Sequence, residues 1–273
     1  MPFTPSHAVI ALPFVRTPLV PAAVAVGAMA PDLPLFTRGL PLAYGRTHDL
    51  VWLPATVLLA LVLLLVWRCL LRPAVRELSP DWLARRLPSE WDRTAPGAFR
   101  DTVGISAERL PGVRQRWRVS ATRISLLALS LIIGVVSHVI WDLFTHEGRG
   151  GVEAFPVLEE QWGPLTGYKW VQHGSSAIGL VILAVWALLW FRRRDAAASV
   201  SRVLPTWVRW AWWLSLPLVL IAAWVIGMGQ YGPITDEWTS AHLAYRVLPP
   251  ACAVWGAATL ALCLVVQSLS RRS

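Results

Sequence analysis

The chain has 273 residues, of which 55% are hydrophobic and only 15% are charged, and its mean hydropathy is +0.51. A soluble domain of this size usually has about a quarter of its residues charged. Here the apolar residues also gather into runs that are long enough to cross a bilayer. The composition therefore excludes an ordinary soluble protein and predicts an all-α, polytopic membrane helical bundle.

The formal net charge of +9 does not indicate a nucleic-acid partner. The arginines sit in the segments between apolar runs, which is the distribution that membrane orientation requires. Cys69, Cys252 and Cys263 lie within predicted spans and show no CxxC spacing, so we interpret them as packing residues. We therefore expect membrane lipid, and no nucleic acid, around this protein.

Residues 1–49 contain two short apolar stretches instead of one long one. Arg16 and three prolines interrupt them, so we predict a pair of short helices that are separated near Pro18. Each is too short to span alone, and the pair is expected to re-enter the membrane among other helices. As an alternative, Ala28-Met29-Ala30 resembles a signal-peptidase site, and cleavage there would remove His7.

About five full spans are predicted after this segment. The apolar runs cover residues 50–71, 124–144, 173–191, 210–227 and 245–269. Residues 72–123 form a basic loop with short amphipathic pieces around 82–87 and 98–109. Residues 124–191 carry the second and third spans, and residues 192–273 carry the last two spans and a basic tail.

The charge of the loops alternates along the chain. Residues 72–123, 192–209 and the tail are basic, whereas residues 145–172 and 228–244 are acidic or nearly neutral. Because basic segments stay in the cytoplasm, the acidic loops are predicted to lie outside. All six histidines then gather at the extracytoplasmic face.

The second span ends with His138, Asp142 and His146 at four-residue intervals. These positions share one helix face, and ionisable groups in a span are costly unless they have partners or a function. His138 and Asp142, about 6 Å apart along the axis, can share one ion, while His146 lies about 12 Å from His138. His146 can join that ion only if the helix ends or bends near Thr145.

Three imidazoles and two carboxylates on one membrane face match the donor set of a divalent metal, most readily Zn²⁺. The predicted ligands are His7, Asp32, His48, His138 and Asp142. The alternative is a polar cap that binds interhelical water, in which Asp32 is only a turn residue.

The motifs resemble those of an uncharacterised actinobacterial multi-pass family, and more distantly the LexA-regulated inner-membrane metal-dependent hydrolases. The residues that carry the resemblance are His7, Pro31-Asp32, Thr47-His48 and the segment from His138 to His146. The resemblance implies a metal-dependent hydrolase in a bacterial plasma (inner) membrane. Spans four and five carry no matching motif.

The chain departs from that pattern in two places. Ala43-Tyr44-Gly45 lacks a histidine that the relatives often carry, and Asp49 replaces a serine. Pro34 stands where the relatives often have a second aspartate. Two potential ligands are therefore missing, which favours one metal over two, and Asp49 and His173 are possible replacements.

The expected chemistry is hydrolysis of an ester or phosphodiester, possibly lipid-linked. Asp49 and His146 are the candidate general bases, and Arg46 can pair with an anionic substrate group or serve as an interfacial anchor. HExxH and Gly-x-Ser-x-Gly sequences are absent, which argues against familiar metalloproteases and serine hydrolases. The rival interpretation is a non-enzymatic transporter or assembly factor with a structural His/Asp cap.

Overall fold

The computed structural model describes residues 4–37, 41–108 and 116–270, and the chain separates into two compact units. The first unit contains Met1–Asp32, Ala43–Val66 and Gly97–Arg194. The second contains Leu33–Leu42, Trp67–Pro96 and Asp195–Ser273. Most of the predicted His/Asp residues belong to the first unit.

Within the described residues, five helical segments are long and apolar enough to cross a membrane, which confirms the predicted all-α polytopic fold. They are Leu50–Leu78, Ala121–Asp142 (α8), Gly167–Arg192 (α10), Thr206–Tyr231 (α11) and Ser240–Ser270 (α12). The chain is therefore an integral membrane protein. Most of these segments continue beyond their apolar runs into flanking polar residues, whereas α8 begins three residues before its run and ends two residues before the end of that run, at Asp142.

The basic loop predicted at residues 72–123 is more structured than expected. The first span continues from α4 (Leu53–Val66) through a π-helical segment, Trp67–Leu71, into α5 (Arg72–Leu78). The remaining elements are α6 (Asp81–Ala84), the 3₁₀ turn η5 (Ser89–Asp92), α7 (Ala95–Thr102) and strands β1 (Ile105–Glu108) and β2 (Arg116–Val119). The two strands pair antiparallel, with Ile105 opposite Val119.

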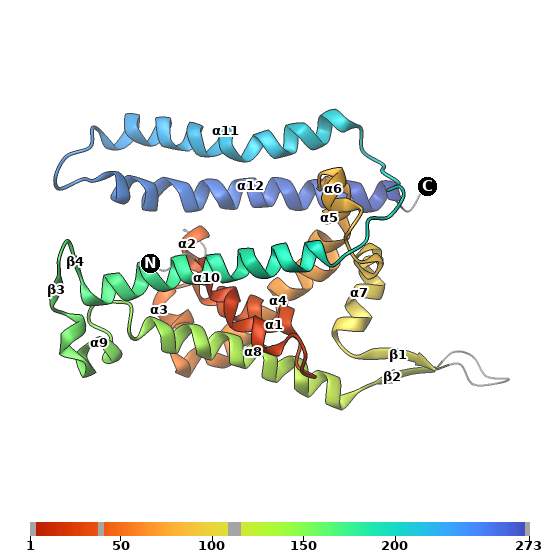
Figure 1. Ribbon diagram of the computed structural model, residues 1–273, viewed down its shortest axis with the longest axis horizontal. Coiled ribbons are helices and arrows are strands. Elements are labelled where there is room, and N and C mark those ends of the chain that lie inside the picture. Colours follow the sequence, from red (N-terminus) through yellow and green to blue (C-terminus); the bar gives the residue numbers. More distant parts are fainter. Residues whose placement is uncertain (1–3, 38–40, 109–115, 271–273) are drawn as a thin grey trace. The chain divides into compact units, whose positions relative to one another are not determined.

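Two short apolar helices form the N-terminal part of the first unit, as predicted. They are the 3₁₀ helix η1 (Thr4–Phe14) and α1 (Pro21–Met29), which runs into the 3₁₀ turn η2 (Ala30–Asp32). Their lengths of roughly 22 and 14 Å are below the ~30 Å of a bilayer core. Figure 1 shows α1 crossing α8.

Two glycines bring α1 and α8 into backbone contact. A Cβ added to Gly134 would lie 2.8 Å from the Ala28 nitrogen and 2.8 Å from the Gly27 Cα. Close approach through small residues is a common way for helices to pack in membranes. The Val20 N–H also donates to the Ser130 Oγ of α8 at 2.9 Å. These contacts hold the segment that leads to Asp32 against the helix that carries His138.

Shorter elements complete the first unit. They are α3 (Tyr44–Thr47), the 3₁₀ turn η3 (Leu50–Trp52), α9 (Gly150–Ala154), the 3₁₀ turn η6 (Pro156–Leu158), and the paired strands β3 (Gln161–Trp162) and β4 (Leu165–Thr166). The α3 turn is important for the site because it presents His48 directly after its last residue.

The second unit is built on α11 and α12, which run side by side in opposite directions (Figure 1). The short α2 (Leu33–Phe36) also packs on α12. A small core joins α5, α12 and the linker before α11, and consists of Ala74, Leu78, Leu204, Cys263 and Val266. The buried Glu77 carboxylate accepts hydrogen bonds from the backbone N–H groups of Val203 and Leu204, both at 3.0 Å.

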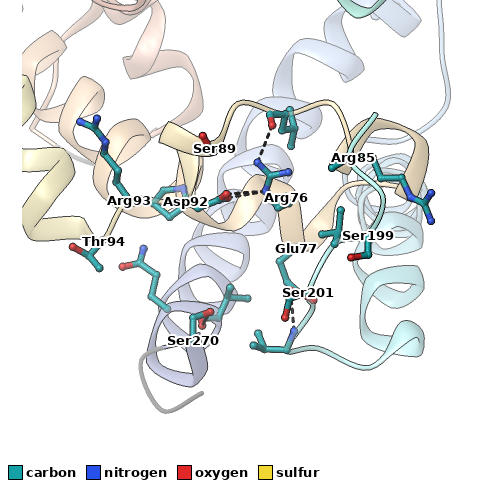
Figure 2. Close-up of a pocket in the computed structure, with 17 residues that line it drawn as sticks. Arg76, Glu77, Arg85, Ser89, Asp92, Arg93, Thr94, Ser199, Ser201 and Ser270 are labelled. Atoms are coloured by element: carbon teal, nitrogen blue, oxygen red, sulfur yellow. Dashed lines mark hydrogen bonds and ion pairs between the residues drawn. The ribbon is translucent and has the colours of Figure 1, made fainter. Parts of the chain in front are cut away.

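A cavity of about 550 Å³ lies in the second unit, between the segment around α5 and the linker before α11. Figure 2 shows the side chains that line it. Its charged walls are largely paired. The Arg76 Nε donates to both Asp92 oxygens, at 2.8 and 3.0 Å, and its Nη2 donates to the Leu87 and Pro88 carbonyls. We interpret the hydrogen bonds of Arg76 and Glu77 as structural: those of Arg76 hold the segment of residues 87–92, and those of Glu77 hold the linker before α11.

Candidate metal centre

Four buried side chains of the first unit direct their polar atoms toward one another. The Nε2 atoms of His48 and His138 lie 3.1 Å apart. His48 Nε2 is 3.3 Å from Asp142 Oδ2 and 3.7 Å from Asp32 Oδ1. His138 Nε2 is 3.5 Å and 3.7 Å from the same two oxygens. None of these four side chains is more than 4% exposed.

The other ring nitrogen of each histidine is occupied by a backbone carbonyl. His138 Nδ1 lies 2.7 Å from the Ala28 oxygen, and His48 Nδ1 lies 2.9 Å from the Tyr44 oxygen. A carbonyl only accepts, so both Nδ1 atoms carry hydrogen. In the neutral rings, both Nε2 lone pairs then face the same small space, which is the arrangement that metal-binding histidines adopt.

The distances between the two histidines, and from each histidine to the two carboxylates, are compatible with a shared ion. Four ligand atoms placed tetrahedrally about 2.0–2.2 Å from zinc lie roughly 3.3–3.6 Å from one another. The five distances given above run from 3.1 to 3.7 Å. The buried His/Asp group can therefore hold a metal ion.

His7 belongs to the same cluster. Its ring centroid is 4.2 Å from that of His138, and the ligand atoms of His7, His138 and Asp142 lie within 4.8 Å of one another. Among the described residues, neither His7 Nε2 nor Asp142 Oδ1 has a hydrogen-bond partner, although both atoms are buried. Burial lowers the pKa of His7 to about 4, so the ring is neutral.

The cluster can be read as two overlapping groups of ligands, His7 with His138 and Asp142, and His138 with Asp32 and His48. Both groups need His138, and that ring has only one nitrogen left for a metal, because the other lies against the Ala28 carbonyl. The arrangement therefore suits one ion better than two.

Without a cation, a proton takes its place. Burial lowers the pKa of His48, but hydrogen bonds to Asp142, to Asp32 and to the Tyr44 carbonyl outweigh it and raise this pKa to about 9. The two carboxylates favour a positive charge on His48, and a bound metal ion would supply that positive charge instead. A proton on Nε2 and a metal ion are alternatives at this position.

Local structure explains why these segments meet. Thr47 donates from Oγ1 to the Pro31 carbonyl at 2.7 Å, which ties the turn before His48 to the turn that carries Asp32. Thr4 donates from Oγ1 to Asp32 Oδ2 at 2.7 Å. The Tyr44 hydroxyl lies 3.5 Å from Asp142 Oδ2. Hydroxyl groups therefore position both carboxylates.

His146 lies beside the cluster without joining either group of ligands. α8 ends at Asp142, and the turn that follows brings His146 Nδ1 to 3.7 Å from Asp142 Oδ2. The helix therefore ends three residues before Thr145, which meets the condition for His146 to approach the cluster. His146 Nε2 also lies 3.3 Å from the amide nitrogen of Gln172.

Three further candidates lie outside the cluster. Asp49 is exposed and caps the next turn, where its Oδ1 accepts from the Val51 N–H at 2.9 Å. The Arg46 guanidinium lies 4.9 Å from the centre of the Trp52 ring, which fits the alternative role of an interfacial anchor. His173 is exposed on α10. In the described part of the chain, no hydrogen bond or ion pair connects these three to the cluster.

The sequence analysis missed Thr4 and the glycine contact between α1 and α8. Thr4 gave no signal, since a threonine near a terminus is common. The glycines did give one: Ala23-xxx-Gly27 and Ser130-xxx-Gly134 are pairs of small residues four positions apart, which predict close helix packing in a membrane.

The fold and the site define a class: polytopic all-α membrane proteins with a buried His/Asp cluster that can hold a metal ion. The chain belongs to the family described as domain of unknown function DUF4184, whose model matches residues 1–269. No curated protein and no solved structure matches the chain.

Proposed function

We propose that this protein is a membrane-embedded, metal-dependent hydrolase of ester or phosphodiester bonds, with zinc as its metal. The observation that carries the proposal is the convergence of His48 and His138, with Nε2 atoms 3.1 Å apart, on the carboxylates of Asp32 and Asp142. Burying two carboxylates costs much free energy unless a cation compensates them. The resemblance to the inner-membrane metal-dependent hydrolases supports the same function.

A bound zinc ion would supply Lewis acidity, by polarising an ester or phosphoryl oxygen and by lowering the pKa of a water molecule. The protein's part is to hold His48 and His138 in the correct tautomer through backbone carbonyls. Asp32 and Asp142 supply negative charge. We assign His7 to the side of the cluster where a substrate enters, because it also borders a cavity.

Of the two candidate general bases, the geometry favours His146. Its ring lies 3.7 Å from Asp142 Oδ2, at the edge of the cluster, whereas Asp49 is exposed and caps a turn. Proton transfer needs a base within hydrogen-bond reach of the reacting group or one water away from it. Arg46 lies against Trp52 outside the cluster, so we assign it the role of an interfacial anchor.

We place the protein in a bacterial plasma membrane with the cluster toward the extracytoplasmic side. The support is the alternation of basic and acidic loops along the chain, which follows the positive-inside rule.

Metal analysis of the detergent-purified protein tests the function at its first step. The wild type is expected to carry about one zinc per chain, and His138→Ala and Asp142→Ala are expected to carry almost none. His173→Ala is the matched control, because His173 is an exposed histidine outside the cluster. Equal and near-zero zinc in all four proteins would end the metal hypothesis.

A second measurement separates a hydrolase from a structural metal site. Hydrolysis of a short-chain, water-soluble aryl ester and of an aryl phosphodiester is expected in the wild type, and is expected to be lost with chelator and restored with zinc. Full zinc occupancy without hydrolysis of either type of substrate would favour the rival interpretation, a structural polar cap.

A further inference from the structure

A second cavity, of about 400 Å³, lies within the first unit between η1, α8 and α10. Its walls combine aliphatic side chains with a few hydroxyls and the edge of one indole. Its lining includes Ser6, His7, Ser137, Trp141, Ser175 and Ile178. We call it the lateral cavity.

The lateral cavity opens on the surface that the spans present to lipid. Trp141, Ile178 and Ile182 form its rim, and these side chains are 41%, 62% and 44% exposed. They belong to α8 and α10, two helices long and apolar enough to cross the membrane. In a membrane, the acyl chains of lipids surround such a surface.

The inner end of the lateral cavity reaches the His/Asp cluster. His7 lines the cavity and is also a member of the cluster, with its ring centroid 4.2 Å from that of His138. His7 is only 9% exposed, and its Nε2 has no hydrogen-bond partner among the described residues. A cavity with mainly apolar walls is thus lined by a histidine that belongs to the same group of ligands as His138 and Asp142.

Contacts of η1 and α8 with α10 fix the walls of this cavity. A Cβ added to Gly179 of α10 would lie 3.1 Å from the Ser6 oxygen and 3.3 Å from the Ser6 Cβ, so η1 rests on α10 there. On the other wall, Trp141 Nε1 donates to Ser175 Oγ at 3.2 Å and joins α8 to α10. Other polar groups on the walls bond locally, as Ser137 Oγ does with the Gly134 carbonyl at 2.7 Å.

We propose that the lateral cavity binds one acyl chain of a membrane lipid and thereby places that lipid's ester group at His7, beside the His/Asp cluster. This inference rests on the proposed hydrolase function and specifies its substrate class as acyl lipid esters. The aliphatic walls suit the chain, and the polar end of the cavity suits the ester carbonyl.

Photolabelling of the full-length protein in nanodiscs tests the binding directly. The probe is a phosphatidylglycerol with a diazirine in its acyl chain, and mass spectrometry identifies the labelled peptides. Labelling is expected to concentrate on the peptides of η1 and on residues 175–182. Ser137→Phe, which fills the cavity wall, is expected to reduce labelling of these peptides at least fivefold.

Ser125→Phe is the matched control, because Ser125 is exposed on the same helix and does not line the cavity. It is expected to label like the wild type. Ile178→Trp provides a second variant at the rim if Ser137→Phe elutes as an aggregate. Labelling spread evenly over the five spans, or unchanged in both cavity variants, would overturn the proposal.

Zinc content measured on the same samples separates the two proposals. Cavity labelling in a wild type without zinc would retain lipid binding and reject the hydrolase. Zinc in the wild type without cavity labelling would reject the acyl-chain site alone. If both hold, Ser137→Phe should hydrolyse a long-chain ester at least tenfold more slowly relative to a short-chain ester than the wild type does.

Discussion

The Nε2 atoms of His48 and His138 lie 3.1 Å apart, although the two residues are separated by 90 positions in the chain. Each ring is fixed by its Nδ1 atom, which lies against a backbone carbonyl of a different short helix, that of Tyr44 in α3 and that of Ala28 in α1. Two lone pairs that face each other beside two buried carboxylates need a proton or a metal ion between them.

Asp32→Asn should remove the metal with little change in shape. The amide retains the size of the carboxylate but loses its charge, and Asp32 is 1% exposed. We expect zinc occupancy to fall at least tenfold, as measured on purified protein. Asp49→Asn is the control, since Asp49 is exposed and caps a turn. Equal loss in both variants would mean that the metal binds elsewhere.

Thr47→Val should weaken the site without removing a ligand. The Thr47 hydroxyl joins the turn before His48 to the Pro31 carbonyl at 2.7 Å, so its loss frees the two turns from each other. Partners of this type usually change metal affinity by about 10–100-fold, and competition with a zinc chelator measures the change. Thr102→Val removes an equally buried hydroxyl, bonded to Ala98 in α7, and should leave the affinity unchanged.

Gly134→Ala should separate α1 from α8. The added methyl group meets backbone atoms of Gly27 and Ala28, which cannot move aside as a flexible side chain can. Overpacking of this kind costs about 1–3 kcal/mol, so we expect a lower midpoint of thermal unfolding together with reduced zinc occupancy. Gly174→Ala in α10 has open space around it and should be neutral or slightly stabilising. A stable, zinc-loaded Gly134→Ala would contradict the packing argument.

Glu77→Gln should destabilise the second unit and spare the metal centre. The Glu77 carboxylate accepts from two backbone N–H groups and lies 3.6 Å from the Arg209 guanidinium. The amide keeps only one oxygen acceptor, so one of the two backbone N–H groups stays buried without a partner. An unpaired buried donor costs about 1–3 kcal/mol. Faster proteolysis within residues 195–205, at unchanged zinc content, is the expected readout. Glu90→Gln, at an exposed position, is the control.

The orientation of the protein can be tested by cysteine labelling in whole bacterial cells. After Cys69, Cys252 and Cys263 are replaced, Glu159→Cys should react with a membrane-impermeant maleimide. Asp195→Cys should react only after the cells are permeabilised. Both positions are exposed, and one predicted span separates them. The reverse pattern would place the cluster on the cytoplasmic side.

The number of spans and the members of the cluster could be predicted from sequence for clear physical reasons. A bilayer demands about 20 consecutive apolar residues per helix, and five such segments are visible in the printed sequence. Histidines and aspartates at span ends stand out in such a chain, because membrane segments rarely tolerate them. His7, Asp32, His48, His138 and Asp142 were therefore identifiable, and the structure brings all five together.

The structure of the segments between the spans was harder to predict from the sequence. Residues 72–123 were predicted as a polar loop with short amphipathic pieces, yet α5 extends the first span, and β1 pairs antiparallel with β2. The amphipathic pieces are too short for hydrophobic periodicity to specify their boundaries.

The sequence by itself determined that this protein is embedded in a membrane. The length of each apolar run is a local property, and it can be read without knowing how the runs pack together. Only the tertiary structure decided which of the candidate groups share one centre. Asp49 adjoins His48 in sequence yet caps a turn away from the cluster, whereas Thr4 lies 28 residues from the carboxylate it contacts. Local patterns cannot predict such pairings, because they depend on how α1 packs against α8 through Gly27 and Gly134.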